Sequence, residues 1–282
     1  MKISSYIDLT KPAVTFLLVL AGIAGGFLAY PSSNLYGFII SLIALYIATS
    51  GINAITNYID RDIDKKMQRT CNRAIPSGKI KPINALLFGI ILLIISIALA
   101  WLASPYSSFW IVFGVLFDPV LYNWLSKRKT VFNILIGSLA GGAPVFVMWS
   151  GITDKLFAWL PFYLFMIIVI WTPIHIWSIS IKYYDDYKIA GIPMLPVVYG
   201  KKFTARLIGL FALLLTVFTT MIGIIELNYY FLAIVEILNI IMLLLSFKVI
   251  ISSNENDSFK VFIYTNIYLA IIFLLIILNR LI

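Results

Sequence analysis

Residues 83–103 read INALLFGIILLIISIALAWLA, a run without a single charged side chain. An α-helix needs about 20 consecutive apolar residues to cross the hydrocarbon core of a bilayer. Comparable runs lie at Thr15–Tyr30, Leu35–Ile55 and Val261–Asn279. These runs are continuous rather than alternating, and only helices or closed barrels satisfy backbone polar groups in lipid. We therefore predict membrane-spanning helices and no strands.

The composition extends this prediction to the whole chain. Of the 282 residues, 62% are apolar and 12% are charged, whereas soluble domains are about 45–50% apolar. The apolar segments are centred near residues 22, 45, 93, 115, 140, 168, 214, 240 and 270. We expect an all-α membrane protein in which residues 1–282 form one integral-membrane domain with about nine transmembrane helices. The first run is long and lacks a clear cleavage pattern, so we interpret it as a retained helix rather than a secretion signal.

The positive charges are distributed unevenly along the chain, whose net charge is +9. With a cytoplasmic N-terminus and nine spans, Lys and Arg divide 19 inside to 2 outside, the exceptions being Lys155 and Arg280. This asymmetry follows the positive-inside rule, so we predict a multi-pass protein of the cell membrane with cytoplasmic acidic loops. It argues against a nucleic-acid partner, although the basic loops would attract anionic membrane lipid or diphosphate. The lone Cys71 excludes an intramolecular disulfide.

The first acidic motif lies in the connection from about Asn57 to Pro82. Asn53, Asn57, Asp60 and Asp64 follow one another at intervals of four, three and four residues, which places them on one stripe of a helix. Two carboxylates one turn apart repel each other unless a cation compensates them. Mg²⁺ binds through one or two carboxylates together with phosphate oxygens and water, so we predict a Mg²⁺ site here.

Basic side chains follow this motif directly, at Lys65, Lys66, Arg69, Arg73, Lys79 and Lys81. Metal ions and arginines together would neutralise a diphosphate that the carboxylates alone would repel. The alternative is a solvated helix end with exposed Asp–Lys and Asp–Arg pairs, which contribute little energy.

The second acidic motif ends the sixth apolar segment. Asp185 or Asp186 could hold a second metal ion, and four lysines could reach phosphate oxygens: Lys182, Lys188, Lys201 and Lys202. Two-metal sites stabilise leaving-group oxygens. Tyr183, Tyr184 and Tyr187 could shield a carbocation by cation–π attraction and exclude water. Tyrosines at this depth are also common interfacial anchors, which leaves that alternative open.

Three further polar residues fall within or near the predicted spans, where polar side chains are costly. His175 is the only histidine. It could contact a haem propionate, ligate iron, relay a proton, or simply pack with a hydrogen bond. For Asp118 and Glu236 we expect roles in facing a cavity or pairing helices.

Several motifs together resemble a known family. They are Leu9-Thr-Lys-Pro12, Tyr58-Ile-Asp-Arg-Asp-Ile-Asp64 with Met67 and Arg69-Thr70, Asn72-Arg73, Tyr122 to Lys129, Asn133 to Gly137, Ala140-Gly-Gly-Ala-Pro144, Trp171-Thr-Pro173 with His175 and Trp177, Asp186-Tyr187, and Ala190 to Val198. The chain resembles the UbiA superfamily of intramembrane prenyltransferases, and within it the protoheme IX farnesyltransferase (haem O synthase) branch. Thr56 stands where the family's first motif usually has Asn, which makes Asn57 the candidate for that role.

The resemblance implies a ring of nine helices around a central cavity, capped by cytoplasmic loops. The implied reaction is Mg²⁺-dependent farnesyl transfer from farnesyl diphosphate to a vinyl group of haem b, completed by water. Metal and catalytic roles fall on Asp60, Asp64, Asp185 and Asp186, with His175 as a further catalytic candidate. The candidates for binding substrate are Asn57, Arg69, Arg73, Lys127, Arg128, Lys182, Tyr183, Tyr187 and Lys188.

Two alternatives stay open at this point. The segment Ile75-Pro-Ser-Gly78 also resembles lipid and quinone prenyltransferases, so the acceptor could be a quinone precursor or a lipid alcohol. A secondary transporter belongs to another class, but it would carry charges near the middle of the bilayer. The sequence does not decide whether the chain contacts a haem A synthase or a terminal oxidase assembly.

Overall fold

The computed structural model describes residues 3–29, 32 and 34–281, and within them every regular element is a helix. In chain order the elements are α1 (Ile3–Leu9), α2 (Pro12–Phe27), α3 (Leu35–Ile59), α4 (Arg61–Asp64), α5 (Pro82–Ala103), α6 (Pro105–Val115), η1 (Leu116–Ser126), α7 (Asn133–Thr153), α8 (Trp159–Lys182), α9 (Tyr184–Ile189), α10 (Leu195–Tyr199), α11 (Lys201–Glu226), α12 (Tyr229–Ser252) and α13 (Glu255–Leu281). The predicted all-α fold is confirmed.

The long helices match the predicted spans one by one. Among the described residues, eight helical stretches are long and apolar enough to cross a membrane, with α6 and η1 together forming one of them. The ninth, α2, has 16 residues and is about 24 Å long at the usual helical rise. The prediction of about nine spans therefore corresponds to eight full-length helices and one shorter helix.

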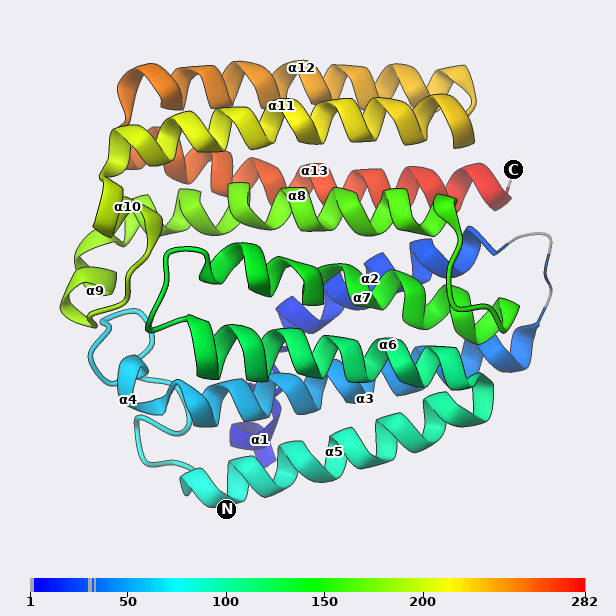
Figure 1. Ribbon diagram of the computed structural model, residues 1–282, viewed down its shortest axis with the longest axis horizontal. Coiled ribbons are helices and arrows are strands. Elements are labelled where there is room, and N and C mark those ends of the chain that lie inside the picture. The colour runs from blue at the N-terminus through cyan, green and yellow to red at the C-terminus, as the bar shows by residue number, and fades with distance from the viewer. Residues whose placement is uncertain (1–2, 30–31, 33, 282) are drawn as a thin grey trace.

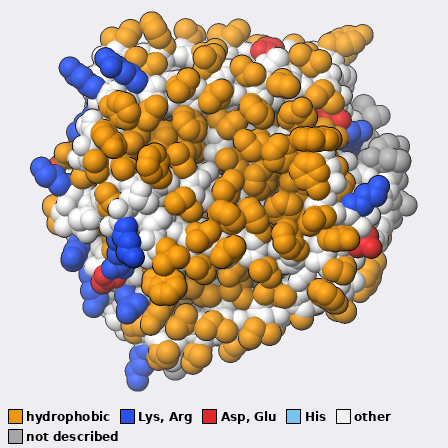
Figure 2. Space-filling model, viewed as in Figure 1, with side chains coloured by type: hydrophobic (Ala, Val, Ile, Leu, Met, Phe, Trp, Pro, Cys, Tyr) orange, Lys and Arg blue, Asp and Glu red, His pale blue; other side chains and the backbone are white. Residues whose placement is uncertain are grey.

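The long helices run side by side, and the short helices α4, α9 and α10 gather at one end of the bundle (Figure 1). The most apolar 18-residue windows of α7 and α8 are each 67% buried within the protein, against 28% for α5. Helices α7 and α8 therefore lie inside the bundle, while α5 presents much of its surface outward. Hydrophobic side chains cover the middle of the face in Figure 2, and Lys and Arg side chains gather at the end with the short helices.

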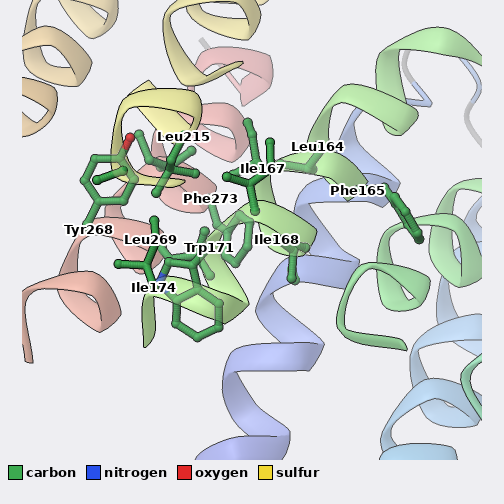
Figure 3. Close-up of a cluster of buried hydrophobic side chains, with 14 of the residues drawn as sticks. Leu164, Phe165, Ile167, Ile168, Trp171, Ile174, Leu215, Tyr268, Leu269 and Phe273 are labelled. Atoms are coloured by element: carbon green, nitrogen blue, oxygen red, sulfur yellow. The ribbon is translucent and has the colours of Figure 1, made fainter. Parts of the chain in front are cut away.

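The largest buried cluster is centred on α8. Trp171 and Ile174 of this helix lie among Leu269 and Phe273 of α13 and Leu215 of α11 (Figure 3). All five side chains are buried. Because lipid tails are as apolar as these side chains, close packing rather than water exclusion holds the helices together.

Glycines allow the helices around α7 to approach closely. A Cβ atom at Gly25 of α2 would lie 2.5 Å from the carbonyl oxygen of Val145. One at Gly142 of α7 would lie 2.4 Å from the Phe165 ring of α8. Small residues at helix contacts are a general feature of membrane bundles. The tightly packed α7 thus forms one wall of the interior.

The fourth span differs from a regular helix. It begins as α6 and continues from Leu116 as the π-helix η1, which contains Pro119. The wider helical turn is seen where the Lys127 amide N–H donates to the Tyr122 carbonyl, five residues back, at 2.8 Å. Segments of π-helix are rare and often occur at functional sites. The local geometry brings side chains four and five residues apart onto one side of this span.

Candidate active site

A cavity of about 370 Å³ lies inside the bundle. Its lining is mostly apolar, with contributions from Trp110 and Ile168, and a few polar side chains enter it, including Lys11, Asp118 and His175. Small-molecule sites typically combine apolar walls with a few convergent polar groups. The cavity therefore suits a long apolar substrate that carries one charged or reactive end.

The first acidic motif lies where α3 ends. Asp60 is the C-terminal cap of α3, and its Oδ2 lies 2.5 Å from the Nζ of Lys127. Asp64 lies one turn further on, and its two oxygens accept from one guanidinium nitrogen of Arg73 at 3.0 and 2.9 Å. Only 6% of Asp60 and 3% of Asp64 is exposed. Each buried carboxylate therefore has its own cationic partner.

These carboxylates fit the predicted divalent cation. Asp60 Oδ1 is buried and has no hydrogen-bond partner, although buried polar atoms are normally satisfied. Within residues 3–29, 32 and 34–281, no group of three or more His, Cys, Asp or Glu side chains is arranged to hold a metal. Mg²⁺ does not require such a cage, because it retains waters and takes one or two carboxylates together with phosphate oxygens. Asp60 and Asp64 are the residues that would hold it.

The second acidic motif reaches the loop that follows the first. Asp186, in the short helix α9, accepts from the backbone N–H groups of Gln68 and Arg69, both at 3.4 Å. These distances are longer than the usual 2.7–3.2 Å or so. The Arg69 guanidinium also lies over the Tyr183 ring, 5.4 Å from its centroid. Asp185 is exposed, and no described residue forms an ion pair with it. The fold thus brings Asp186 to the loop that follows the first motif but leaves Asp185 exposed.

The other candidates from the basic and aromatic sets lie at the C-terminal end of α8 and in α9. The ammonium groups of Lys182 and Lys188 lie 5.7 and 5.9 Å from the ring centroids of Phe259 and Tyr184, respectively. Tyr187 is buried in the main hydrophobic cluster. These contacts leave both lysine ammonium groups close to the short helices at the end of the bundle.

Two predicted substrate-binding residues form contacts within the protein. Asn57 donates its amide to the backbone carbonyls of Leu9 and Asn53, at 3.2 and 2.8 Å, and so anchors the N-terminal segment. Arg128 forms a two-pronged pair with Asp62, with both distances 2.7 Å. The Arg128 hydrogen bond holds the pKa of Asp62 below its usual value.

His175 projects into the cavity from α8. Its ring stacks on Trp171, with centroids 4.5 Å apart, since residues four apart lie on one face of a helix. Nδ1 lies 3.2 Å from the Thr265 hydroxyl, and no described residue forms a hydrogen bond with Nε2. Trp177 faces elsewhere and packs edge-on against Phe211 of α11. The Nε2 atom of His175 is therefore the one free to meet a ligand.

Two residues here, Lys11 and Asn123, had no predicted role in the site, and a third, Asp118, takes up the cavity-facing position that was one of its two predicted roles. Lys11 lines the cavity, and its Nζ lies 3.5 Å from the Thr56 hydroxyl. Burial, together with nearby Arg73, lowers the pKa of Lys11 to about 8. Asp118 and Asn123 belong to η1. In the sequence, Lys11 stands directly before the first span and Asp118 stands inside the fourth. That both side chains line the same cavity depends on the packing of the helices.

The basic partner of Asp60 remains charged despite its surroundings. Burial tends to lower the pKa of Lys127, but the adjacent Asp60 carboxylate outweighs that effect and raises the pKa above its ordinary value. The Lys127 ammonium group lies 5.5 Å from the ring centroid of Tyr122, which lines the cavity, and is well placed to meet an anionic group. Two buried carboxylates and two basic side chains thus lie together at the end of α3.

The model of the UbiA prenyltransferase family matches residues 15–274. The chain belongs to the UbiA prenyltransferase family. Curated relatives within it carry the name of the branch expected from the motifs. A protoheme IX farnesyltransferase from Thermoplasma acidophilum is 37% identical, covering 98% of this chain and 97% of the relative. Protoheme IX farnesyltransferase 1 from Picrophilus torridus is 39% identical, covering 98% and 94%. The predicted membership of the protoheme IX farnesyltransferase branch is confirmed.

Solved structures of UbiA proteins have the same fold. A digeranylgeranylglyceryl phosphate synthase aligns with a TM-score of 0.79 and 22% identity, covering 99% of this chain and 98% of its own. A UbiA homologue from Archaeoglobus fulgidus, bound to GPP and Mg²⁺, aligns with a TM-score of 0.70 and 15% identity, covering 96% and 99%. This UbiA chain is therefore a multi-pass membrane prenyltransferase by family and by fold.

Proposed function

We propose that this protein transfers a farnesyl group from farnesyl diphosphate to a vinyl group of haem b, in a Mg²⁺-dependent reaction that water completes. The observation that carries the proposal is the near full-length similarity to curated protoheme IX farnesyltransferases. The cavity supports it, because mostly apolar walls with a few polar side chains, among them Lys11 and Asp118, suit a prenyl diphosphate. The whole chain, residues 1–282, is proposed to act as one domain.

The paired charges at the entrance indicate how the diphosphate would be held. Without ligand, Asp60 pairs with Lys127 and Asp64 with Arg73. On binding, the carboxylates would turn to the cation, and Lys127 and Arg73 would turn to phosphate oxygens. The bound Mg²⁺ would neutralise the diphosphate and favour its departure. Because each charge exchanges one opposite partner for another, no charge is left buried and uncompensated.

The acceptor would lie against the aromatic side chains that line the cavity. Haem is broad and flat, and Trp171 and His175 form a stacked pair on α8. With Nδ1 held at Thr265, the Nε2 atom of His175 would face a propionate or the iron of the acceptor. Tyr183, whose ring lies beneath Arg69, and the buried Tyr187 would shield the allylic cation from water.

The decisive experiment is incubation of the purified protein with haem b, Mg²⁺ and a panel of prenyl diphosphates, followed by mass spectrometry. The expected product is haem b that has gained one farnesyl group and one hydroxyl group, with release of diphosphate and a proton and loss of activity in chelator. Prenylation of a quinone precursor or lipid alcohol, with haem b ignored, would contradict the acceptor while preserving the prenyl-transfer chemistry. Transport without diphosphate release would contradict both.

His175→Ala tests the acceptor side separately. We expect haem turnover to fall while farnesyl diphosphate affinity stays within about twofold, because the diphosphate is held by the separate acidic motifs. Trp177→Phe is the control on the same helix, since Trp177 contacts Phe211 rather than the cavity. Equal losses of turnover and diphosphate affinity in His175→Ala would contradict this role.

We propose that the protein lies in the cell membrane with both acidic loops on the cytoplasmic side. The basic side chains gathered at that end of the bundle support this orientation (Figure 2), as does the positive-inside rule. Cys71 is the only cysteine and lies in the first loop. An impermeant thiol reagent should therefore leave it unmodified in intact cells and label it in inverted vesicles. Labelling in intact cells would reverse the topology.

A further inference from the structure

Asp118 is an acidic side chain in the interior of a membrane bundle. It lines the central cavity rather than the lipid face. Asn123 donates to its Oδ1 at 2.6 Å, and no described residue donates to Oδ2. A carboxylate in such surroundings is costly to maintain. Its placement beside the reaction space therefore requires a reason.

The other acid within the spans makes a useful contrast. Glu236 of α12 accepts from Thr220 of α11 at 2.6 Å and lies near the amide of Asn239. It does not line the central cavity, and its contacts pair α11 with α12. Among the described residues, none from another helix forms a hydrogen bond with Asp118: its partner, Asn123, belongs to η1 itself, and Lys11 and Lys127 are cationic neighbours of the carboxyl group. Helix pairing accounts for Glu236 but not for Asp118.

A chain of polar contacts leads from Asp118 to the entrance. Asn123 donates to Asp118 and accepts from the Nζ of Lys127 at 3.3 Å. Lys127 in turn contacts Asp60. The wider turns of η1 bring residues 118, 123 and 127 into this sequence of contacts. Asp118 thus lies deeper in the cavity than the diphosphate site, about two helical turns along η1.

The proposed reaction needs a base at such a depth. The C1–O bond of farnesyl diphosphate breaks and diphosphate leaves with the electron pair. The vinyl π electrons then form a bond to C1, which leaves the cation on the vinyl carbon attached to the porphyrin. The oxygen of water bonds to that carbon, and one proton must leave the water. The receiving group must lie beyond C1, away from the diphosphate, on the cavity side of the entrance.

We propose that Asp118 is the general base of this step, its Oδ2 accepting the proton from the water that adds to the cation. The role rests on the proposed function. Asn123 holds the carboxylate through Oδ1, which leaves Oδ2 for the water. The overall balance is one farnesyl diphosphate, one haem b and one water giving hydroxyethylfarnesyl haem, diphosphate and a proton. Positioned bases contribute about 100- to 10,000-fold to such steps.

Asp118→Asn tests the assignment, with Glu236→Gln as the matched control because it also converts an acid within a span to an amide. The assay incubates each full-length protein with haem b, farnesyl diphosphate and Mg²⁺ in ¹⁸O-labelled water. Asp118→Asn should lower kcat for the labelled, hydroxylated product by at least about 100-fold. Its KM for farnesyl diphosphate should stay near the wild-type value. Glu236→Gln should behave as wild type.

The distribution of products supplies a second measurement. Without the base, the cation should lose a proton from the neighbouring carbon to diphosphate, giving an alkene lighter than the normal product by one water. Asp118→Glu should restore part of the hydroxylated product, since it retains a carboxylate. Asp118→Ser is a second removal variant, so the test does not depend on the folding of one protein.

The outcomes separate this inference from the proposed function. If the wild type converts haem b, and Asp118→Asn or Asp118→Ser yields the hydroxylated product at the wild-type rate, the base assignment is wrong. It is also wrong if Asp118→Asn only weakens farnesyl diphosphate binding. If the wild type itself does not convert haem b, the proposed function fails before any variant is compared.

Discussion

The two acidic motifs carry similar residues in very different surroundings. Asp60 and Asp64 of the first motif are buried, and each has a cationic partner, Lys127 or Arg73, within 3 Å or so. In the second motif, Asp186 accepts two backbone hydrogen bonds of 3.4 Å. Asp185 is exposed. The carboxylates of the first motif are thus fixed by close ion pairs, whereas the second motif makes only two long hydrogen bonds to the loop at Gln68 and Arg69.

The elements that carry the two motifs explain this contrast. Asp60 caps the 25-residue helix α3, which packs extensively on α5 and α7. Asp186 belongs to the six-residue helix α9, soon followed by Gly191 with a left-handed φ of 71°. Positions fixed by a packed helix are more precise than positions on loops. We therefore propose that the first motif defines the diphosphate site and that the second motif adds contacts to it.

The largest expected effect comes from the first motif. Asp60→Ala and Asp64→Ala should each lower prenyl transfer by more than about 100-fold, the scale seen when an electrostatic stabiliser of a transition state is removed. Asp60→Ala should also destabilise the protein by roughly 3–5 kcal/mol, because Lys127 is left buried without its partner. Product formation in membranes and thermal unfolding in detergent measure the two effects.

A double variant separates these effects. Asp60→Ala combined with Lys127→Met removes both charges, so thermal stability should return towards the wild-type value while prenyl transfer stays lost. If activity returned together with stability, the role of Asp60 would be structural and its assignment to the metal would be wrong.

The second motif should give a smaller effect of another kind. Asp186→Ala should raise KM for the prenyl diphosphate by about 10- to 100-fold, the range expected for losing one or two charge-assisted contacts. Thermal stability should hardly change, because the two hydrogen bonds of Asp186 are long. Asp185→Ala is the adjacent control, and we expect a weaker effect from it. If Asp186→Ala lowered thermal stability as much as Asp60→Ala, the two motifs would not differ in how firmly the fold holds them.

A third effect is a change of about tenfold in the affinity for the prenyl diphosphate, and it should depend on pH. Burial lowers the pKa of Lys11 to about 8, so its amine is charged below that pH and neutral above it. Affinity for the prenyl diphosphate should therefore fall as pH rises through about 8, by an amount near 1.4 kcal/mol. Lys11→Arg stays charged and should flatten this limb of the profile. A wild-type profile that is flat between about pH 7 and 9 would count against a role for Lys11.

The smallest effect should come from the exposed pair beside the first motif. Asp62→Asn breaks the two-pronged contact with Arg128 and should cost less than about 1 kcal/mol, as is usual for surface ion pairs. Because the pKa of Asp62 is lowered, its contribution to stability is present above the unfolded-state pKa. That contribution is lost as pH falls through the folded-state pKa, and thermal unfolding in acid would measure it.

Much of the candidate site could be predicted from spacing, but the partners could not. The four-residue interval between Asp60 and Asp64 predicted a shared face, and the pattern of Lys and Arg predicted that the acidic loops lie at one end. That Lys127 pairs with Asp60 across 67 residues of chain, and that Asp185 points outward, depended on the packing. The fourth span was expected to be an ordinary helix. Its second half is instead the π-helix η1, in which Asn123 contacts both Asp118 and Lys127.

The amino-acid sequence by itself determined the all-helical membrane architecture, the approximate positions of nine spans and the two acidic motifs. These are local properties, because the length of an apolar run and the periodicity of a helix depend on neighbouring residues alone. The tertiary structure decided which carboxylates are buried and paired, that Asp186 meets the loop at Arg69, and that Asp118 faces the cavity. Ion pairs between helices and the walls of a cavity depend on how distant segments pack, and packing is a property of the whole bundle.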